Sequence, residues 1–410
     1  MSERVYILGG VQTDFARNWA REGVDLLEVF SDTLNQGLEE VGLEYMDLET
    51  GHVGNFVGDL FNGQGILGGF FGMVDPSLAG LPTARHEAAC ASGSIALLAA
   101  AAEIEAGRYG LACVLGIEQM RNVPGEQAAQ YLGAATWAGH ECQDVKYPWP
   151  HMFGKLGDEY DRRYGLKHEH LAAIARINFD NAKNNPHAQT RHWQFSDINF
   201  TEDDEANPVI DGRIRKQDCG QVTDGAAVVF LASAARAREY AQARNIPFES
   251  LPYIRGWGHR SAPIEYDRKI AQSRDADYVF PHVRGTITDA YERAGLSGVG
   301  EIDVVETHDC FTTTEYMAID HLGITAPGES WKAIEEGRIA MSGDIPINPS
   351  GGLIGCGHPV GATGVRMMLD GWKQLMEKAG DYQITGAKTV QTLNIGGSGT
   401  TAVSFILSKD

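Results

Sequence analysis

LEVFSDTLNQGLEEVGLEYMDLETGHVGNF (27–56) is matched late in the chain by a stretch of the same design, VRGTITDAYERAGLSGVGEIDVVETHDCF (283–311). In both, apolar residues at helical spacing lead to Gly-Leu, a short acidic link and a β-rich run that ends in Phe. Four further pairs follow in the same order: RVYILGG (4–10) with PYIRGWG (252–258), the small-residue helix after position 90 with GATGVRMMLDGWKQLM (361–376), LACVLGIEQ (111–119) with TVQTLNIGG (389–397), and DGAAVVFLAS (224–233) with GTTAVSFILS (399–408). These matches favour a duplicated α/β unit, with a mixed sheet in each half, over two unrelated α/β domains.

About a hundred residues in the middle of the chain have no counterpart in this repeat. They are rich in His, Asn, Asp, Trp and Tyr, and they include one long helical pattern over residues 155–185. Such a segment is too long and too periodic for a plain loop. We therefore expect an N-terminal half formed by residues 1–118 and 219–250, an inserted cap subdomain over residues 119–218, and a C-terminal half over residues 251–410.

The composition limits the classes of partner. The chain has 410 residues, with 34 Lys and Arg against 55 Asp and Glu, for a formal net charge of −21. Nucleic acids and anionic membranes need a basic face, so neither is an expected partner. The longest apolar stretches, around residues 95–102, are far shorter than a membrane span. Because MSERVYILGG (1–10) enters a strand directly, we expect no signal peptide and a cytoplasmic location.

Cysteine usage agrees with a reducing compartment. The six cysteines, at positions 90, 113, 142, 219, 310 and 356, form no CxxC pair and no His/Cys cluster at zinc spacing. The spacing therefore predicts neither a disulfide framework nor a metal site.

Cys90 stands out within RHEAACASGSIALLAAAAEIEAG (85–107), where a run of tiny residues becomes a helix. A free cysteine is often only a small hydrophobic filler. At a helix N-terminus, however, the helix dipole stabilises a thiolate and favours a nucleophile. The other candidate segments decide between these two interpretations.

Three segments of the C-terminal half offer partners for such a nucleophile. INPSGGLIGCGHPVGATGVRMM (347–368) holds His358 on a glycine-rich turn, as expected for the base that activates a thiol. VVETHDCFTTTE (304–315) presents His308 and Cys310 at the end of a strand, where ligand sites of α/β sheets form. LNIGGSGTT (393–401) ends a strand in glycines whose N–H groups are candidates for an oxyanion hole.

Taken together, these segments resemble the thiolase superfamily along nearly the whole chain. The resemblance is carried by ACASGS around Cys90, NPSGG…GHPVGATGVR around His358, VTDGAA (222–227) and the final GGSG. It implies a duplicated thiolase fold of two pseudo-symmetric halves, with mixed five-stranded sheets in αβαβα layers. The implied activity is acyl-CoA C-acyl transfer: cleavage of a 3-ketoacyl-CoA by CoA, or the reverse condensation.

Two departures place the chain nearer to the sterol-carrier-protein type of thiolase. It has HDCF where common thiolases have Asn-Glu-Ala-Phe, and Asn394 where they have a second catalytic cysteine. The resemblance then implies Cys90 as nucleophile, His358 as its activator, and Cys310 as the acid/base in place of residue 394. His308 and His358 are the implied donors to the enolate oxygen, and the N–H groups of Cys90 and Gly396 the donors to the tetrahedral intermediate.

The resemblance also suggests ligands, partners and alternatives. Coenzyme A is the implied substrate, with no permanently bound cofactor, and HMFG (151–154) makes His151 and Met152 candidate substrate contacts or ordinary cap residues. Thiolases are usually dimers or tetramers, so a homo-oligomer is expected. The alternatives are a thiolase-fold retro-aldol lyase working with a small zinc-ribbon/OB-fold partner, a ketoacyl or hydroxymethylglutaryl-CoA synthase-like enzyme, and, least favoured, a non-catalytic acyl-CoA carrier.

Overall fold

The backbone of the molecule is built around one long mixed sheet. A computed structural model describes residues 3–410, and its nine-stranded sheet has the order β3-β2-β4-β7-β1-β8-β11-β10-β9. The N-terminal half supplies β1 (Val5–Gln12), β2 (Thr50–Gly54), β3 (Thr83–His86), β4 (Leu111–Glu118) and β7 (Gly225–Ala232). The C-terminal half supplies β8 (Tyr253–Ser261), β9 (Val304–Thr307), β10 (Thr389–Gly396) and β11 (Thr401–Ser408).

The two halves are related strand by strand, which confirms the duplicated α/β fold. β1 corresponds to β8, β2 to β9, β4 to β10 and β7 to β11, with the same parallel and antiparallel pairings in each half. β3 is represented in the C-terminal half only by a single parallel bridge between Val305 and Ile347. The five strands of the N-terminal half and the four of the C-terminal half, where five were expected, form one continuous sheet because Val5 and Tyr6 of β1 pair with Ile254 and Tyr253 of β8.

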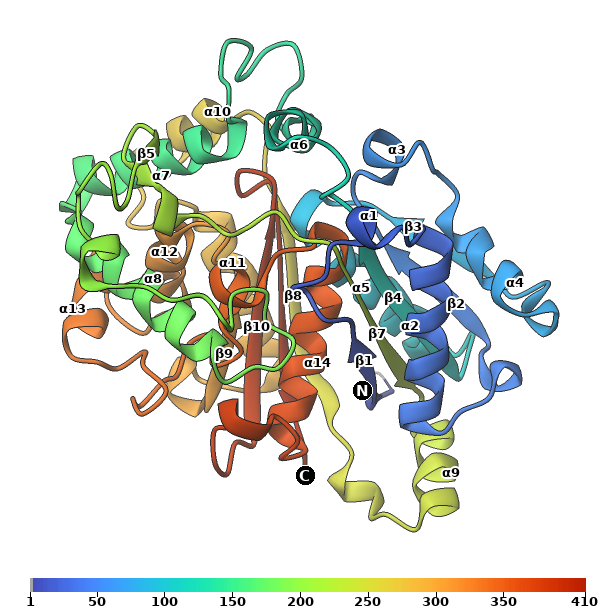
Figure 1. Ribbon diagram of the computed structural model, residues 1–410. Coiled ribbons are helices and arrows are strands. Elements are labelled where there is room, and N and C mark those ends of the chain that lie inside the picture. The colour runs from blue at the N-terminus through green and yellow to red at the C-terminus, as the bar shows by residue number, and fades with distance from the viewer. Residues whose placement is uncertain (1–2) are drawn as a thin grey trace.

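Helices form three layers around the two halves of the sheet. α2 (Leu26–Val41) packs on β1 and β7, and α11 (Pro281–Ala294) packs on β8 and β11. Between the halves lie α5 (Ser92–Glu105) and α14 (Thr363–Leu375), which contact each other and strands on either side. Figure 1 shows α14 running through the centre of the molecule, beside β10 on one side and β1 on the other.

The repeated Gly-Leu signal is a helix C-cap. α2 and α11 both end at a glycine in the left-handed region, Gly42 (φ 65°) and Gly295 (φ 67°). In each case the following leucine donates its N–H back into the last turn, from Leu43 to Leu38 O and from Leu296 to Tyr291 O. Glycine adopts this conformation without a Cβ penalty, so the same stop signal appears in both halves.

The segment between β4 and β7 combines three α-helices with long loops, and it lies largely at the top and left of the molecule in Figure 1. It contains α6 (Gly125–Leu132), α7 (Pro148–Tyr164), α8 (His168–Ala182) and the two-stranded β5 (Val209–Asp211) and β6 (Ile214–Arg215). The single helix expected over residues 155–185 is wrong. Gly165, at φ 81°, ends α7, and α8 begins three residues later.

The remaining helices are shorter or lie on the outside. They are α1 (Trp19–Glu22), α3 (Gly58–Phe61), α4 (Phe71–Val74), α9 (Ala234–Arg244), α10 (Tyr266–Gln272), α12 (Thr312–Leu322) and α13 (Ser330–Glu335). Within residues 3–410, no helix combines the length and the apolar character that crossing a membrane requires.

A buried cation ties the central helix to the C-terminal half of the sheet. Arg366 of α14 is fully buried, and its Nη1 donates to Glu306 of β9 (3.0 Å), to Asp370 (2.9 Å) and to the Ser350 hydroxyl (2.9 Å). Removing one partner of a buried ion pair leaves an uncompensated charge in a low-dielectric interior. Arg366 therefore fixes α14 relative to β9 and to the loop that precedes the helix.

Replacing this cation should destabilise the protein strongly. We expect Arg366→Leu to lower the free energy of unfolding by about 3–5 kcal/mol, because Glu306 and Asp370 lose their counter-charge. Chemical denaturation measures the change. The exposed pair Arg17–Glu22 is the control, and Arg17→Gln should cost less than about 1 kcal/mol. Equal effects of the two substitutions would contradict this account of the buried network.

Candidate active site

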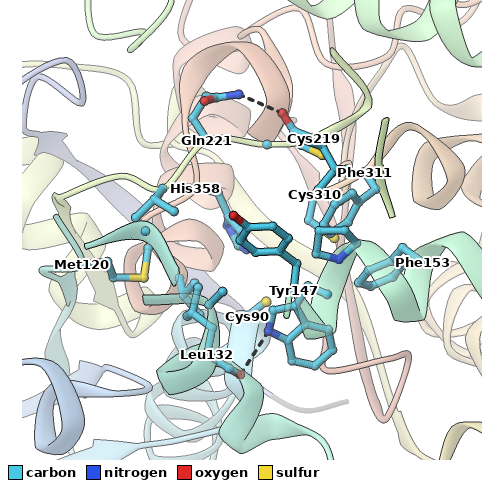
Figure 2. Close-up of a pocket in the computed structure, with 18 of the residues that line it drawn as sticks. Cys90, Met120, Leu132, Tyr147, Phe153, Cys219, Gln221, Cys310, Phe311 and His358 are labelled. Carbon is cyan, nitrogen blue, oxygen red and sulfur yellow. Dashed lines mark hydrogen bonds between the residues drawn. The ribbon is translucent and has the colours of Figure 1, made fainter. Parts of the chain in front are cut away.

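A cavity of about 370 Å³ opens where the segment between β4 and β7 meets both halves of the repeat. Its walls are mostly apolar and aromatic, and they include the thiols of Cys90 and Cys310 and the imidazole of His358. Figure 2 shows these three side chains around the hollow, with Tyr147 of the cap between them and Met120, Leu132 and Phe153 at the sides. The structure therefore brings three of the candidate residues to one cavity.

Cys90 is held on a strained turn just before α5. Ala89, the residue before it, has φ 49°, which is costly for a residue with a Cβ. Gly93, in the first turn of α5, faces the loop of His358: a Cβ there would lie 2.8 Å from Gly361 O and 2.9 Å from Val365 N. The glycine thus permits the close approach that brings Cys90 to the other half.

His358 is fixed by both halves of the chain. Its backbone N–H donates to the Thr223 hydroxyl (2.9 Å), and Val222 forms a parallel bridge with it. The VTDGAA segment therefore holds the GHP turn in place. Gly357, at φ 120°, supplies a backbone conformation that other residues rarely adopt.

Glu118, which the sequence analysis did not single out, also anchors this turn. The side chain is fully buried at the end of β4, and it accepts the N–H groups of Gly361 (3.0 Å) and Phe56 (2.8 Å). Burial, offset partly by these hydrogen bonds, raises the pKa of Glu118 to about 7. The signal available in the sequence was an acidic residue at the end of an apolar, strand-like run, LACVLGIEQ (111–119).

The nucleophile candidate and two imidazoles meet at one point. Cys90 Sγ, a ring nitrogen of His308 and a ring nitrogen of His358 all lie within 4.8 Å of one another. The two rings are perpendicular, with centroids 5.3 Å apart. Cys90 comes from the N-terminal half and both histidines from the C-terminal half, so the site exists only across the interface.

Hydrogen bonds hold the two imidazoles in opposite tautomers. The Thr363 hydroxyl donates to Pro359 O (2.9 Å), so it accepts from Nδ1–H of His358 (2.8 Å), which leaves Nε2 with a free lone pair. Asn394 instead donates its amide to Nδ1 of His308 (3.1 Å), so Nε2 of His308 carries the proton. The site thus presents one proton acceptor and one hydrogen-bond donor.

Burial keeps these groups uncharged. It lowers the pKa of His358 to about 3, with Arg366 adding to the effect, and it lowers the pKa of His308 well below the usual range. Burial also raises the pKa of Cys90 to about 12. The expectation that the helix N-terminus stabilises a resting thiolate is therefore wrong, because desolvation outweighs the nearby N–H groups.

Cys310 lies at the start of the loop after β9 and faces the same cavity. Its Sγ is 3.6 Å from the Thr314 hydroxyl, and burial, followed by the neighbouring Cys90, raises its thiol pKa well above the usual range. The adjacent Asp309 turns away from the cavity and accepts the N–H groups of Leu353 and Ile354. The HDCF segment therefore both presents a thiol and braces the loop that leads to His358.

The glycine turn after β10 lies directly behind Cys90. A Cβ on Gly396 would collide with Ala88 O, so the two loops touch there through bare backbone. The backbone N–H groups of Gly397 and of Cys90 itself partly offset the effect of burial on the pKa of the Cys90 thiol. The N–H group of Gly396 remains a predicted donor to the tetrahedral intermediate.

Neither of the cap residues suggested as substrate contacts lines the cavity. Met152 is packed in the core, and His151 pairs with Asp211 (2.9 Å) outside the cavity. Trp149 and Phe153, one helical turn apart on α7, line the cavity instead. A motif gives positions along a chain, whereas the phase of the helix decides which side chains face a cavity.

Comparisons with known proteins agree with this geometry. Residues 5–235 match the family model described as "Thiolase, N-terminal domain", and residues 265–409 match "Thiolase C-terminal domain-like". An "Acetyl-CoA acetyltransferase" from Methanothermobacter thermautotrophicus is 32% identical over 406 residues, covering 99% of each chain. Human "Sterol carrier protein 2" is 28% identical, covering 98% of this chain and 71% of the relative.

Solved structures share the fold. The "Ltp2-ChsH2(DUF35) aldolase" superposes with a TM-score of 0.78 at 18% identity, covering 99% of this chain and 98% of the other. Human mitochondrial 3-ketoacyl-CoA thiolase in complex with CoA superposes with a TM-score of 0.71 at 16% identity, covering 100% and 98%. Because family models match both halves of the chain, and Cys90 and His358 meet between these halves, the chain belongs to the thiolase family.

Proposed function

We propose that the protein is a thiolase-type acyl-CoA C-acyltransferase that works through an acyl group on Cys90. One observation carries the proposal: a thiol, an imidazole acceptor and an imidazole donor lie within 4.8 Å of one another beside an apolar cavity. The acetyl-CoA acetyltransferase relative supports the same class of reaction.

Acyl transfer begins with proton movement from Cys90 to His358. Because the resting pair is neutral, Nε2 of His358 accepts the thiol proton as the sulfur attacks the 3-keto carbon. The bond between the α and β carbons then breaks, leaving an acyl group on Cys90 and the enolate of acetyl-CoA. Nε2–H of His308 and the newly protonated His358 are the donors for the enolate oxygen.

Cys310 serves as the second acid/base. Its thiol protonates the α carbon of the enolate, which releases acetyl-CoA. The resulting thiolate takes the proton of an incoming CoA thiol, and CoA sulfur attacks the acyl group on Cys90. The bond between the acyl carbon and the Cys90 sulfur then breaks, and the departing sulfur takes its proton back from His358. The tetrahedral oxygen formed there lies against the backbone N–H groups around Cys90 and the Gly396–Gly397 turn.

The cavity favours an acyl-CoA ligand despite the acidic composition. The cavity has aromatic walls, formed by Phe56, Trp149, Phe153 and Phe311. Burial of an apolar acyl chain against them is favourable. Lys216 also lines the cavity. It is our candidate contact for an anionic group of the substrate.

The domain division, assembly and location are further parts of the proposal. We assign residues 119–218 as the cap over the substrate, between the two halves. β3 ends the sheet with an unpaired edge beside the exposed Ile66, which supports a homo-oligomer through that edge. All six cysteines are free thiols, which supports a cytoplasmic location.

A retro-aldol lyase acting with a small partner is the second candidate, because the aldolase "Ltp2-ChsH2(DUF35)" shares the fold. A retro-aldol reaction needs no acyl group on a cysteine. Covalent labelling of Cys90 therefore separates the two functions.

The acyl-enzyme is the first test. Wild-type protein incubated with acetyl-CoA should gain the mass of one acetyl group on the peptide that contains Cys90, because the sulfur is the nucleophile. Cys90→Ala should gain none and should lose acyl transfer. Peptide mass spectrometry reads both results. A folded wild-type protein without this increment would refute the nucleophile assignment.

Cys310→Ala should separate acylation from turnover. Cys90 and His358 remain, so the acetyl increment should persist, whereas turnover with 3-ketoacyl-CoA and CoA should fall by about 10²–10⁴-fold without the acid/base. Cys142→Ala, outside the cavity, is the matched control and should retain turnover. If Cys310→Ala turns over normally, another group moves the proton.

Asn394→Asp should switch His308 to the other tautomer, with the proton on Nδ1. A carboxylate accepts a hydrogen bond from Nδ1–H, so Nε2 loses its proton and no longer donates to the substrate oxygen. We expect the rate constant kcat to fall by about 10²–10³-fold, the usual effect of losing one oxyanion donor. Ser94→Ala removes the other hydrogen bond of Asn394 (2.8 Å) without changing the tautomer, and should lower kcat by less than about tenfold. An unchanged kcat in Asn394→Asp would contradict the tautomer assignment.

A further inference from the structure

Two imidazole nitrogens in the site have no hydrogen-bond partner. Nε2 of His308 and Nε2 of His358 make no hydrogen bond, although His308 is fully buried and His358 is 9% exposed. Such groups in a protein interior call for an explanation. Both belong to the group of three side chains in which each offers one ligand atom within 4.8 Å of the others.

The donor set has a distinct chemistry. One thiol and two imidazoles are the ligands that Zn²⁺ prefers, and three protein ligands with one open position are typical of an accessible zinc site. The open position here faces the cavity of about 370 Å³, which gives the ion a route of entry. Tetrahedral ligands at about 2.0–2.3 Å from the ion lie roughly 3.3–3.6 Å from one another, so side-chain rotation must bring any of these atoms that lie farther apart to that separation.

We propose that Cys90, His308 and His358 bind Zn²⁺ when no substrate is present, and that the bound ion reversibly inhibits the enzyme. The inhibition rests on the proposed function, because the ion occupies the nucleophile and its base. The binding does not, because it needs only the geometry of the empty site.

Binding of the ion balances as a ligand exchange. The Cys90 thiol releases its proton to solvent, and the thiolate and the two imidazole nitrogens each displace a water ligand of the hydrated ion. The other waters leave as zinc becomes four-coordinate, except for one that keeps the open position. The Thr363 hydroxyl already fixes His358 in the tautomer that ligation needs. His308 reaches it by rotation of the Asn394 amide, so that Nδ1–H donates to the amide oxygen.

The sequence could not indicate this site by spacing, because its ligands are far apart along the chain. The HDCF segment makes the difference. His308 lies two residues before Cys310 in this segment and adds a second imidazole to the pair formed by Cys90 and His358. The other group of possible ligands, Glu169, His170 and Glu335, has two exposed carboxylates and no thiol.

Cobalt titration of the substrate-free protein tests the proposal. One equivalent of Co²⁺ should give a thiolate-to-metal charge-transfer band in the near ultraviolet, and Zn²⁺ should displace it. A chromophoric chelator then measures the zinc affinity. His308→Asn should weaken zinc binding by more than about 100-fold, since loss of a ligand exceeds the 10–100-fold effect of losing a ligand's hydrogen-bond partner. Cys90→Ser should lose the band.

Matched controls distinguish this site from other ligands. Cys219→Ser removes another thiol of the cavity, and His170→Gln removes the second cluster; both should keep the band and the affinity. Circular dichroism checks that each variant is folded. A missing band in wild-type protein, or wild-type zinc affinity in His308→Asn, would overturn the proposal. Zinc binding without any acyl transfer would leave the zinc site standing and would refute the proposed function, and with it the inhibition.

Discussion

The close contact between the starts of two helices is the constraint on which the site depends. α5 and α14 approach through Gly93, Gly361 and Gly364, where a side chain larger than hydrogen would meet backbone of the opposite half. This contact places a residue just before one helix next to a residue just before the other. Cys90 and His358 are therefore adjacent because the halves are packed, not because the chain brings them near. The glycines of both motifs serve this packing before they serve catalysis.

The same packing determines the charge state of the site. Burying a thiol and two imidazoles disfavours every ionised form, and Arg366 behind them disfavours imidazolium further. The resting site is neutral, and it becomes polar only when the thiol proton moves. Such a site separates charge during the reaction, where the preorganised N–H groups stabilise it, rather than in the free protein, where water would compete.

The sequence predicted the features that have a local physical signal. Gly42 and Gly295 stop helices, so the repeat was visible, and the glycine-rich turn identified His358. Features that depend on three-dimensional packing were missed or misjudged. The helical pattern continues across Gly165, which concealed the break between α7 and α8. The motif that suggested His151 and Met152 carries no information on helix phase, and the helix dipole near Cys90 gave no measure of its desolvation. The role of Asn394 required the hydrogen bonds on both sides of its amide.

Among residues 3–410, the strand pairing between the halves is short, with two residue pairs joining β1 to β8. Alignment of the halves therefore depends mostly on the central helices, since α14 packs on β7 and β1 of the N-terminal half as well as on β10 of its own half. A nascent or partly unfolded chain with one half formed carries a thiol without its base or a base without its thiol. An activated Cys90 thiol therefore exists only in the completely folded protein, and a misassembled chain has no functional site.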